Sequence, residues 1–320
     1  MKVLVSDPLS EVGINIFKEA EGIEVDVKTD LTVPELEEII GEYQGLSIRS
    51  KTKVTADLIA KAKNLKVIGR AGIGLDNVDI PAATDAGIAV MNTPFGNTIT
   101  TAENTIALLM ALSRNIPQAT ATLKDGRWEK KNLKGREIFR KTLGLVGIGN
   151  IGSIVADRAM GLRMKVIGCD PYPDQKTIET LGIQLVSFDE ILAQSDYISI
   201  HTPKNDETTH LFNKDTLAKM KPGAMLINCA RGGIVNEEDL YDALKSNHLA
   251  GAALDVFETE PPGKIKLMEL DNFICSPHLG ASTHEAQDNV ALDVANQIVE
   301  YLLTGKAKNI VNPQDDSCVE

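Results

Sequence analysis

Residues 143–170, LGLVGIGNIGSIVADRAMGLRMKVIGCD, decide the fold. The stretch opens on an apolar run and passes through the glycine pattern Gly147-Ile-Gly149-Asn-Ile-Gly152. It continues as a helix-length amphipathic segment and closes on a second apolar run that ends at Asp170. Strand-like runs that alternate with helical segments are typical of βαβ units and parallel sheets. The stretch therefore predicts two parallel strands joined by a helix.

The three glycines have the spacing of a dinucleotide-binding turn. In such a turn Gly147 makes the bend, Gly149 lets the pyrophosphate approach the backbone, and Gly152 lets the helix pack on the strand. Asp170 stands about 20 residues further on, where an acidic side chain hydrogen-bonds the ribose hydroxyls. Its charge would repel a 2′-phosphate, and no arginine directly follows it, so the pattern favours NAD over NADP. A glycine turn without a ligand is the alternative.

The same alternation of short β-branched runs and amphipathic segments extends over most of the chain and predicts an α/β fold. One series of strands precedes residue 98 and a second series begins at residue 143. The first is expected at 3–6, 23–27, 45–49, 67–70 and 89–91, and the second, of six strands, at 143–148, 164–170, 196–203, 223–230, 251–256 and 272–277.

Two long helical patterns suggest how these series form domains. In residues 98–123 apolar side chains recur at helical spacing, interrupted by Pro117. Residues 282–303 form a second helical pattern, and no further strand pattern follows it. We therefore expect two doubly wound parallel-sheet domains. A Rossmann NAD-binding domain, 99–284, is inserted into a smaller flavodoxin-like substrate-binding domain formed by 1–98 and 285–320.

Composition excludes several classes of function. The chain has 320 residues, a formal charge of −12 and a pI near 5.0, so no basic face for nucleic acid is expected. No secretory leader is apparent, and the longest apolar run, 106–112, is too short for a bilayer. The four scattered cysteines have no zinc-site spacing, so we expect no metal and a soluble cytoplasmic protein.

A second glycine loop, KVIGRAGIGLDNVD at 66–79, resembles the first but lacks its third glycine. Asn77 stands at that place, and Arg70 lies at the mouth of the loop. An arginine beside exposed backbone N–H groups can clamp a carboxylate or a phosphate. A structural turn with a solvated arginine is the alternative.

Three strand ends in the second series carry groups suited to proton and hydride chemistry. Arg231 follows one strand in NCARGGIV, Glu260 another in GAALDVFETEPP, and His278 a third in ICSPHLGAST. A base is needed for a hydroxyl proton and a cation to polarise a carbonyl. His278 is the best of the five histidines for this role if Glu260 contacts it, and His201 in ISIHTP is the reserve candidate. Sequence alone leaves that contact open.

With these segments the chain resembles the D-isomer-specific 2-hydroxyacid dehydrogenases. The match runs through RSKTKVTADLI, VIGRAGIGLDNVDI, VMNTPFGNT, LGLVGIGNIG, NCARGGIV, GAALDVFETEPP and PHLGAST. The resemblance implies that Arg231, Glu260 and His278 are catalytic. It implies a cofactor site of Gly147, Gly149, Asn150, Ile151, Gly152, Asp170, Thr202, Cys229, Ala230, Arg231, Asp255, His278, Gly280 and Ala281. Asp255 would meet the nicotinamide amide, and the substrate contacts would be Arg49, Arg70, Ala71, Gly72, Asn97 and Lys130.

The resemblance also implies an activity, the NAD-dependent oxidation of 3-phospho-D-glycerate to 3-phosphohydroxypyruvate, the first step of serine biosynthesis, in a homodimer or higher homo-oligomer. Lys130 stands where members with a phosphorylated substrate often carry arginine, and lysine lacks the planar fork. Reduction of glyoxylate, hydroxypyruvate or another 2-keto acid therefore stays open. So does a corepressor-like scaffold that senses NAD. Longer members add a serine-sensing region; if residue 320 is the natural end, this is a short form without it.

Overall fold

The computed structural model describes residues 1–312. The chain divides into two compact units, which we describe separately. Unit 1 contains residues 1–97 and the chain from residue 281 onward, and unit 2 contains residues 98–280. Within residues 1–312, no helix combines the length and apolar character needed to cross a bilayer.

Unit 1 is built on a five-stranded parallel sheet. Its strands are β1 (Lys2–Val5), β2 (Glu24–Val27), β3 (Gly45–Ile48), β4 (Val67–Arg70) and β5 (Ala89–Asn92). Their order across the sheet, β2-β1-β3-β4-β5, is the flavodoxin-like order, so the predicted fold of this part is confirmed. The connections change direction between β1 and β3, and the loops that follow these two strands meet there.

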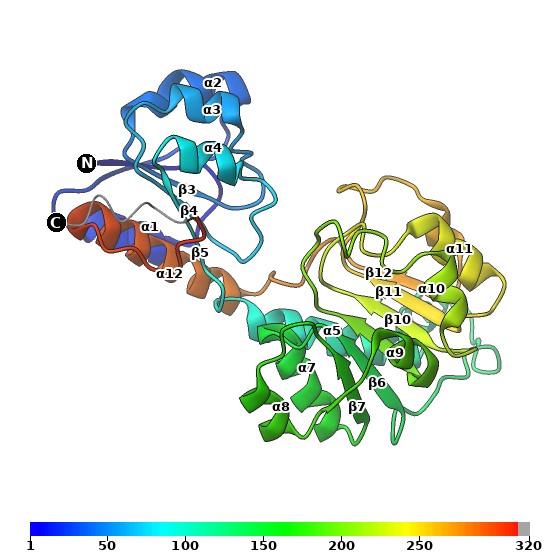
Figure 1. Ribbon diagram of the computed structural model, residues 1–320. Helices are drawn as coiled ribbons and strands as arrows, with labels where there is room; N and C mark the ends of the chain where they lie inside the picture. Colours follow the sequence, from blue (N-terminus) through cyan, green and yellow to red (C-terminus); the bar gives the residue numbers. More distant parts are fainter. Residues whose placement is uncertain (313–320) are drawn as a thin grey trace. The chain divides into compact units, whose positions relative to one another are not determined.

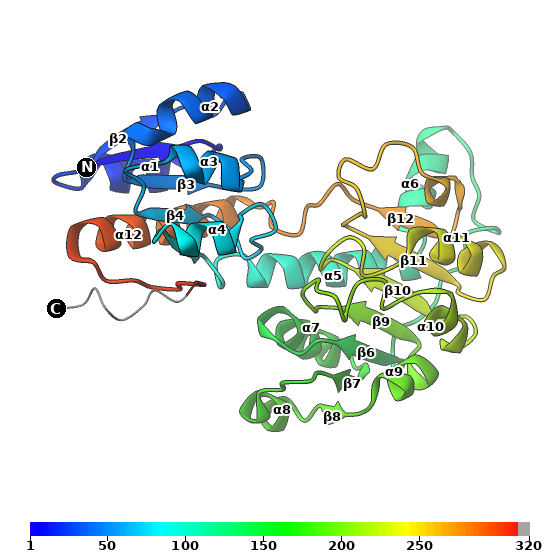
Figure 2. The same ribbon diagram turned by 45° about the horizontal axis from the view of Figure 1, so that its top comes forward.

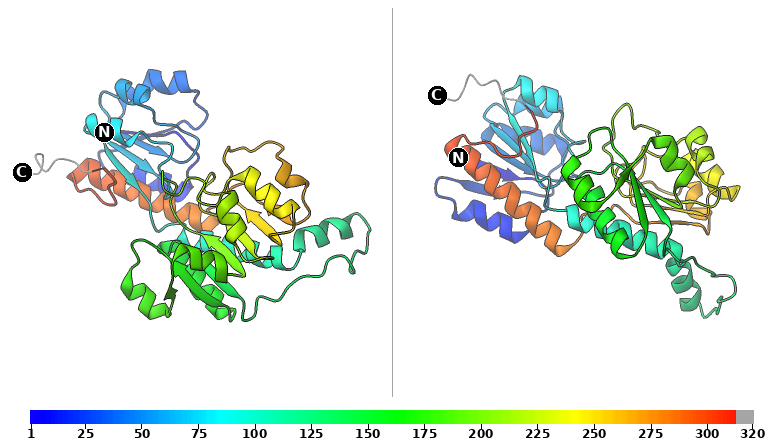
Figure 3. Two further views of the ribbon diagram at one scale, coloured as in Figure 1. Left: turned by 45° about the vertical axis from the view of Figure 1, so that its right-hand side comes forward. Right: turned by 60° about the horizontal axis from the view of Figure 1, so that its bottom comes forward.

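Helices cover both faces of this sheet. They are α1 (Glu11–Glu19), α2 (Val33–Ile39), α3 (Ala56–Lys61), α4 (Ile80–Asp85) and α12 (His284–Thr304), with a short 3-10 turn η1 (Ile40–Glu42). Alternate residues of β1 point to opposite cores: Leu4 packs with residues of α2 and α3, whereas Val3 and Val5 pack with residues of α1 and α12. The C-terminal helix lies along α1 (Figure 3), so distant segments of the sequence complete one layer.

Unit 2 contains a seven-stranded parallel sheet. Its strands are β6 (Thr142–Val146), β7 (Lys165–Cys169), β8 (Gln184–Leu185), β9 (Tyr197–Ile200), β10 (Met225–Asn228), β11 (Gly251–Leu254) and β12 (Phe273–Cys275). The order β12-β11-β10-β9-β6-β7-β8 is visible in Figure 2 and reverses between β6 and β9, as in a Rossmann fold. The six expected strands are present. The seventh, β8, was missed because it is two exposed residues at the sheet edge.

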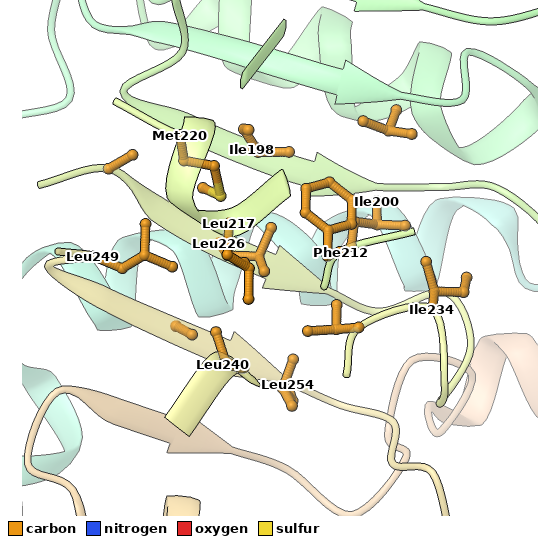
Figure 4. Packing of buried hydrophobic residues seen from close by; sticks show 14 of the residues in the cluster. Ile198, Ile200, Phe212, Leu217, Met220, Leu226, Ile234, Leu240, Leu249 and Leu254 are labelled. Atoms are coloured by element: carbon orange, nitrogen blue, oxygen red, sulfur yellow. The ribbon is translucent and has the colours of Figure 1, made fainter. Parts of the chain in front are cut away.

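The helices of unit 2 are α5 (Thr98–Ser113), α6 (Ile116–Lys124), α7 (Asn150–Gly161), α8 (Gln175–Leu181), α9 (Phe188–Gln194), α10 (Lys214–Lys219) and α11 (Glu237–Lys245), with a 3-10 turn η2 (Lys266–Glu269). They pack around this sheet, apart from α6, none of whose residues is buried. Figure 4 shows the core on one face, where Phe212 and Leu217 pack over Ile198 and Leu226. The pattern at 98–123 is two helices, because Asn115 adopts a left-handed conformation just before Pro117.

Candidate active site

The turn between β6 and α7 shows why its three glycines are needed. Gly147 has φ of +94°, and a Cβ there would lie 2.7 Å from the carbonyl oxygen of His201. A Cβ at Gly152 would overlap the carbonyl oxygen of Gly147. At Gly149, by contrast, a Cβ would meet no atom within 4 Å. Two glycines therefore close the turn on itself, and the third leaves its outer side open to a ligand.

The N-terminus of α7 faces the same turn and is suited to an anion. Gly149 is the N-cap residue and offers no side-chain cap, and the first turn carries no acidic residue. The first amides of a helix lack intrahelical acceptors and lie at the positive end of its dipole. The amides of Asn150 and Ile151 thus suit a diphosphate, which is the chemistry expected of a dinucleotide site.

Asp170 is fixed beside this turn, directly after β7. Its Oδ2 accepts a hydrogen bond of 2.7 Å from the amide of Ile148, and its Oδ1 accepts one of 2.8 Å from the amide of Tyr172. The carboxylate is only partly buried, so its remaining lone pairs can accept hydrogen bonds from sugar hydroxyls. The turn, the helix start and Asp170 together fit NAD.

His278 and Glu260 are in contact, which the sequence left open. Nδ1 of His278 lies 2.6 Å from Oε2 of Glu260, and Oε1 of Glu260 accepts a hydrogen bond of 3.1 Å from the amide of Phe257. The ring nitrogen that faces a carboxylate carries the proton. Nε2 of His278 is therefore the nitrogen left to exchange a proton with a substrate. The two side chains are 50% and 36% exposed, so solvent and small molecules reach them.

Asp255 holds the turn that carries His278. The carboxylate is fully buried and accepts hydrogen bonds from Ser276 Oγ (2.5 Å), the amide of Leu279 (2.8 Å) and the amide of Gly280 (2.7 Å). His278 itself has φ of +53°, and its amide donates to the carbonyl of Asp255. Asp255 thus fixes residues 276–280 against the end of β11. Its expected contact with the nicotinamide amide stays a prediction.

Arg231 lies in the loop after β10. The strands β10, β11 and β12 are parallel neighbours in the sheet (Figure 1). The loops that carry Arg231, Glu260 and His278 therefore all begin at the carboxyl ends of these strands. The side chain of Asn228 ties this loop, since its Nδ2 donates to the carbonyl of Arg231 (2.9 Å) and its Oδ1 accepts from the amide of Ala230 (2.9 Å). Sequence reasoning missed Asn228 and Ser276, and their positions at strand ends were the only signal.

The reserve histidine has a different environment. Nε2 of His201 bonds Ser199 Oγ at 2.8 Å, and burial lowers the pKa of His201 to about 4. It is neutral at physiological pH, and its backbone packs against Gly147 of the glycine turn. Cys229 is also buried, which raises the pKa of its thiol to about 12, so it is no nucleophile. The expected cofactor contacts of Thr202, Cys229 and Ala230 stay predictions.

In unit 1, the end of β4 and the loop after it carry the expected substrate contacts Arg70, Ala71 and Gly72, and their roles stay predictions. We expected this loop to hold an anionic group of the substrate with Arg70 and backbone N–H groups. The amide of Ala71 donates to the carbonyl of Ile48 (2.8 Å), and that of Gly72 donates to Thr93 Oγ1 (2.7 Å). Both amides are therefore paired within unit 1. A Cβ at Gly72 would overlap the guanidinium of Arg70.

The other expected substrate contacts lie on separate segments. In unit 1, Arg49 follows β3 and its amide donates to the buried Asp7 (2.6 Å), while Asn97 is buried just before α5. In unit 2, Lys130 is exposed in the loop after α6. Their roles, and that of Ala281 directly after Gly280, stay predictions. Residues 1–312 contain no cluster of three or more side chains suited to a metal ion.

Comparison with known proteins agrees with this geometry. Residues 106–280 match the family model described as "D-isomer specific 2-hydroxyacid dehydrogenase, NAD binding domain". A D-3-phosphoglycerate dehydrogenase from Synechocystis is 50% identical over 311 residues, which are 97% of this chain and 56% of the relative. The chain thus spans little more than half the length of that relative.

Two solved structures are similar over almost the whole chain. A glyoxylate reductase from Paecilomyes thermophila has a TM-score of 0.90 at 30% identity, covering 97% of this chain and 98% of its own. An NAD-dependent formate dehydrogenase from Staphylococcus aureus, in complex with NAD, has a TM-score of 0.86 at 30% identity, covering 98% and 100%.

Proposed function

We propose, from the premise that the chain belongs to the D-isomer specific 2-hydroxyacid dehydrogenase family, that it oxidises 3-phospho-D-glycerate to 3-phosphohydroxypyruvate with NAD. This reaction is the first step of serine biosynthesis. The contact between His278 Nδ1 and Glu260 Oε2 carries the proposal, because it lies on the same sheet edge as Arg231, in a unit that matches an NAD-binding domain. The similarity to D-3-phosphoglycerate dehydrogenases supports the choice of substrate.

The cofactor would be held by the turn from Gly147 to Gly152, the N-terminus of α7 and Asp170. When bound, NAD accepts a hydride from the carbon that carries the substrate hydroxyl. The protein's task is then to hold the substrate and to move one proton.

His278 is the proposed base. Because its Nδ1 proton is directed to Glu260, the lone pair of Nε2 accepts the hydroxyl proton, and the imidazolium that results is stabilised by the carboxylate. Arg231 is proposed to bind the substrate carboxylate and to stabilise the developing carbonyl oxygen through its fixed cation. Reduction uses the same groups in reverse, with His278 as the acid.

We assign recognition of the substrate's anionic groups to Arg70 and Arg49, with Asn97 and Lys130 as further contacts. Guanidinium groups match carboxylate and phosphate oxygens in pairs, and a free phosphate monoester carries nearly two charges to neutralise. Ala71 and Gly72 would shape this loop, because their amides are occupied.

The test is a panel of D-2-hydroxy acids and 2-keto acids, followed by NADH absorbance. We expect turnover of 3-phospho-D-glycerate with NAD and of 3-phosphohydroxypyruvate with NADH. His278→Ala should lower kcat about 10² to 10⁴-fold, the usual contribution of a positioned acid or base. His284→Ala, on the exposed start of α12, is the matched control. Wild-type turnover by His278→Ala would remove His278 from the mechanism.

A reductase for glyoxylate or hydroxypyruvate is the second candidate, favoured by the similarity to a glyoxylate reductase and by the lysine at residue 130. The kcat/KM for 3-phosphohydroxypyruvate against hydroxypyruvate separates the two. Equal values would favour this candidate. Absence of turnover on every acid, together with NAD-dependent binding of a protein, would instead favour the scaffold role.

We also propose that the protein is a cytoplasmic homodimer. Helix α6 buries none of its residues, and Ile116, Leu123 and the nearby Trp128 are 52%, 58% and 79% exposed. A second copy that presents the same apolar residues would cover them in a symmetric interface. Sedimentation should show a dimer that Leu123→Asp weakens. The free thiols of Cys169, Cys229 and Cys275 suit a reducing compartment.

A further inference from the structure

The peptide bond between Phe257 and Glu258 touches two parts of the proposed site. On one side a Cβ at Gly232 would overlap the carbonyl group of Phe257, so the loop that carries Arg231 packs its backbone directly on this peptide. On the other side the amide of Phe257 donates to Oε1 of Glu260. The position of this one peptide therefore sets both the Arg231 loop and the carboxylate that contacts His278.

Two glutamates outside the expected site hold that peptide. The amide of Glu258 donates to Oε1 of Glu237 (2.6 Å), and the amide of Glu237 donates to Oε1 of Glu258 (3.1 Å). The exchange links the catalytic loop to the first turn of α11, which the side chain of Asn236 caps. Each glutamate side chain thus accepts a hydrogen bond from the backbone of the other, so the reciprocal pair ties the loop to the helix.

A third element closes the arrangement. Nε2 of His210 lies 3.3 Å from Oε1 of Glu258, and the amide of His210 is paired with the carbonyl of Gly233 (2.8 Å). The two carboxylates face each other, and both burial and the charge of Glu258 raise the pKa of Glu237. A like charge at close range disfavours the charged form of a carboxyl.

We propose that Glu237 and Glu258 are positioning residues for catalysis: their reciprocal hydrogen bonds hold the Phe257–Glu258 peptide where it places Arg231 and Glu260 together. The inference rests on the proposed function, since it assumes that these two residues and His278 perform the reaction. It predicts that the acceptor oxygen of each glutamate matters rather than its charge, because the acceptor fixes the opposite backbone.

Paired substitutions separate the effect of the acceptor oxygen of each glutamate from the effect of its charge. Glu237→Ala and Glu258→Ala remove the acceptor and should lower kcat about 10 to 100-fold, in line with the cost of slightly misplaced catalytic groups. The KM for NAD should stay within about twofold, because the glycine turn and Asp170 are unaffected. Glu237→Gln and Glu258→Gln retain an acceptor and should restore kcat to near the wild-type value. Glu238→Ala is the control, since this neighbour contacts Lys266 instead.

A second readout does not depend on turnover. In ¹⁵N-histidine-labelled protein, the ring nitrogens of His278 should show a proton on Nδ1 in the wild type and in the glutamine variants. The alanine variants should show a mixture of tautomers, because Glu260 is no longer held. His278→Gln assigns the signals. If the alanine variants fail to fold, Glu237→Asp takes their place, because it draws the acceptor back by one methylene and keeps the charge.

Each possible outcome of these measurements either supports or overturns the positioning role of Glu237 and Glu258. A kcat within twofold of wild type in both alanine variants, with an unchanged His278 tautomer, would show that the pair only stabilises the fold and would overturn the proposal. Glutamine variants as impaired as the alanine variants would also overturn it. If the wild-type protein turns over none of the acids, the proposed function fails, and a tautomer change in the alanine variants still supports the positioning role.

Discussion

Replacing Glu260 by glutamine removes the charge beside His278 and keeps an acceptor for its Nδ1 proton. The amide oxygen can accept the Nδ1 proton as Oε2 does over 2.6 Å, but the amide nitrogen then replaces Oε1, and the hydrogen bond from the amide of Phe257 is lost. What also changes is the stability of the imidazolium that forms when Nε2 takes the hydroxyl proton. Glu260→Gln therefore removes the electrostatic contribution of the pair together with the hydrogen bond from Phe257.

The magnitude follows from Coulomb's law and the exposure of the two groups. Unit charges about 4 Å apart interact by about 1 kcal/mol in water and by about 4 kcal/mol at an effective dielectric constant of about 20. Since the side chains are 50% and 36% exposed, solvent screens the pair and a value of about 2 kcal/mol is expected. At about 1.4 kcal/mol for each tenfold change, kcat should fall about 30-fold.

Single-turnover and steady-state rates with 3-phospho-D-glycerate and NAD measure this fall. Glu260→Ala should cost more than Glu260→Gln, because it also frees the ring to rotate, and Glu269→Gln on the exposed turn η2 should change nothing. A Glu260→Gln rate within threefold of wild type would refute the argument. It would mean that Glu260 orients His278 without stabilising its charge.

Three further predictions concern the cofactor, the substrate and acid stability. Asp170→Ala should raise the KM for NAD about tenfold and reduce the ratio of kcat/KM for NAD to that for NADP, and initial rates with both cofactors measure this change. Arg70→Ala should raise the KM for the acid at least tenfold and leave NAD affinity nearly unchanged; the reverse pattern would exchange the roles of the two glycine loops. His201 has a pKa of about 4 in the fold against 6.5 unfolded, so the unfolded chain binds more protons between these values and stability falls as pH falls through that window. His201→Gln should make Tm less sensitive to acid there and leave the pH dependence of kcat above about pH 7 unchanged.

The fold was predictable because its signals are local. Most strands are short apolar runs followed by a polar or glycine residue, and the turn at 147–152 carries its own steric reason, since Gly152 lies against the carbonyl of Gly147. The edge strand β8 has no such signal, because its two residues are exposed and gain little from burial. Its pairing with β7 is a property of the assembled sheet.

The site was predictable only in part, because a contact between residues on two different loops has no signal in the sequence of either loop. The types of residue at 231, 260 and 278 indicated the chemistry, but the bond between Glu260 and His278 joins loops from two different strands. Asp255 shows the same limit: the family resemblance implied a contact with the cofactor, which stays a prediction, and no local signal indicated that its carboxylate accepts three hydrogen bonds from the turn after β12. A buried carboxylate with several donors serves the turn before it serves a ligand.

The two glycine loops differ at the position of the third glycine, where Asn77 stands in the loop after β4, and the structure explains this difference. In the β6–α7 turn the third glycine is needed because a helix begins there and packs on the strand behind it. In the loop after β4, no helix begins until α4, so residue 77 has room for a side chain. The side chain of Asn77 occupies this space, and its Nδ2 donates hydrogen bonds to the backbone carbonyls of Arg49 (2.7 Å) and Thr52 (2.6 Å). The loop after β4 is thereby tied to the backbone of the segment that carries Arg49, which agrees with the proposal that Arg49 and Arg70 recognise the anionic groups of one acid.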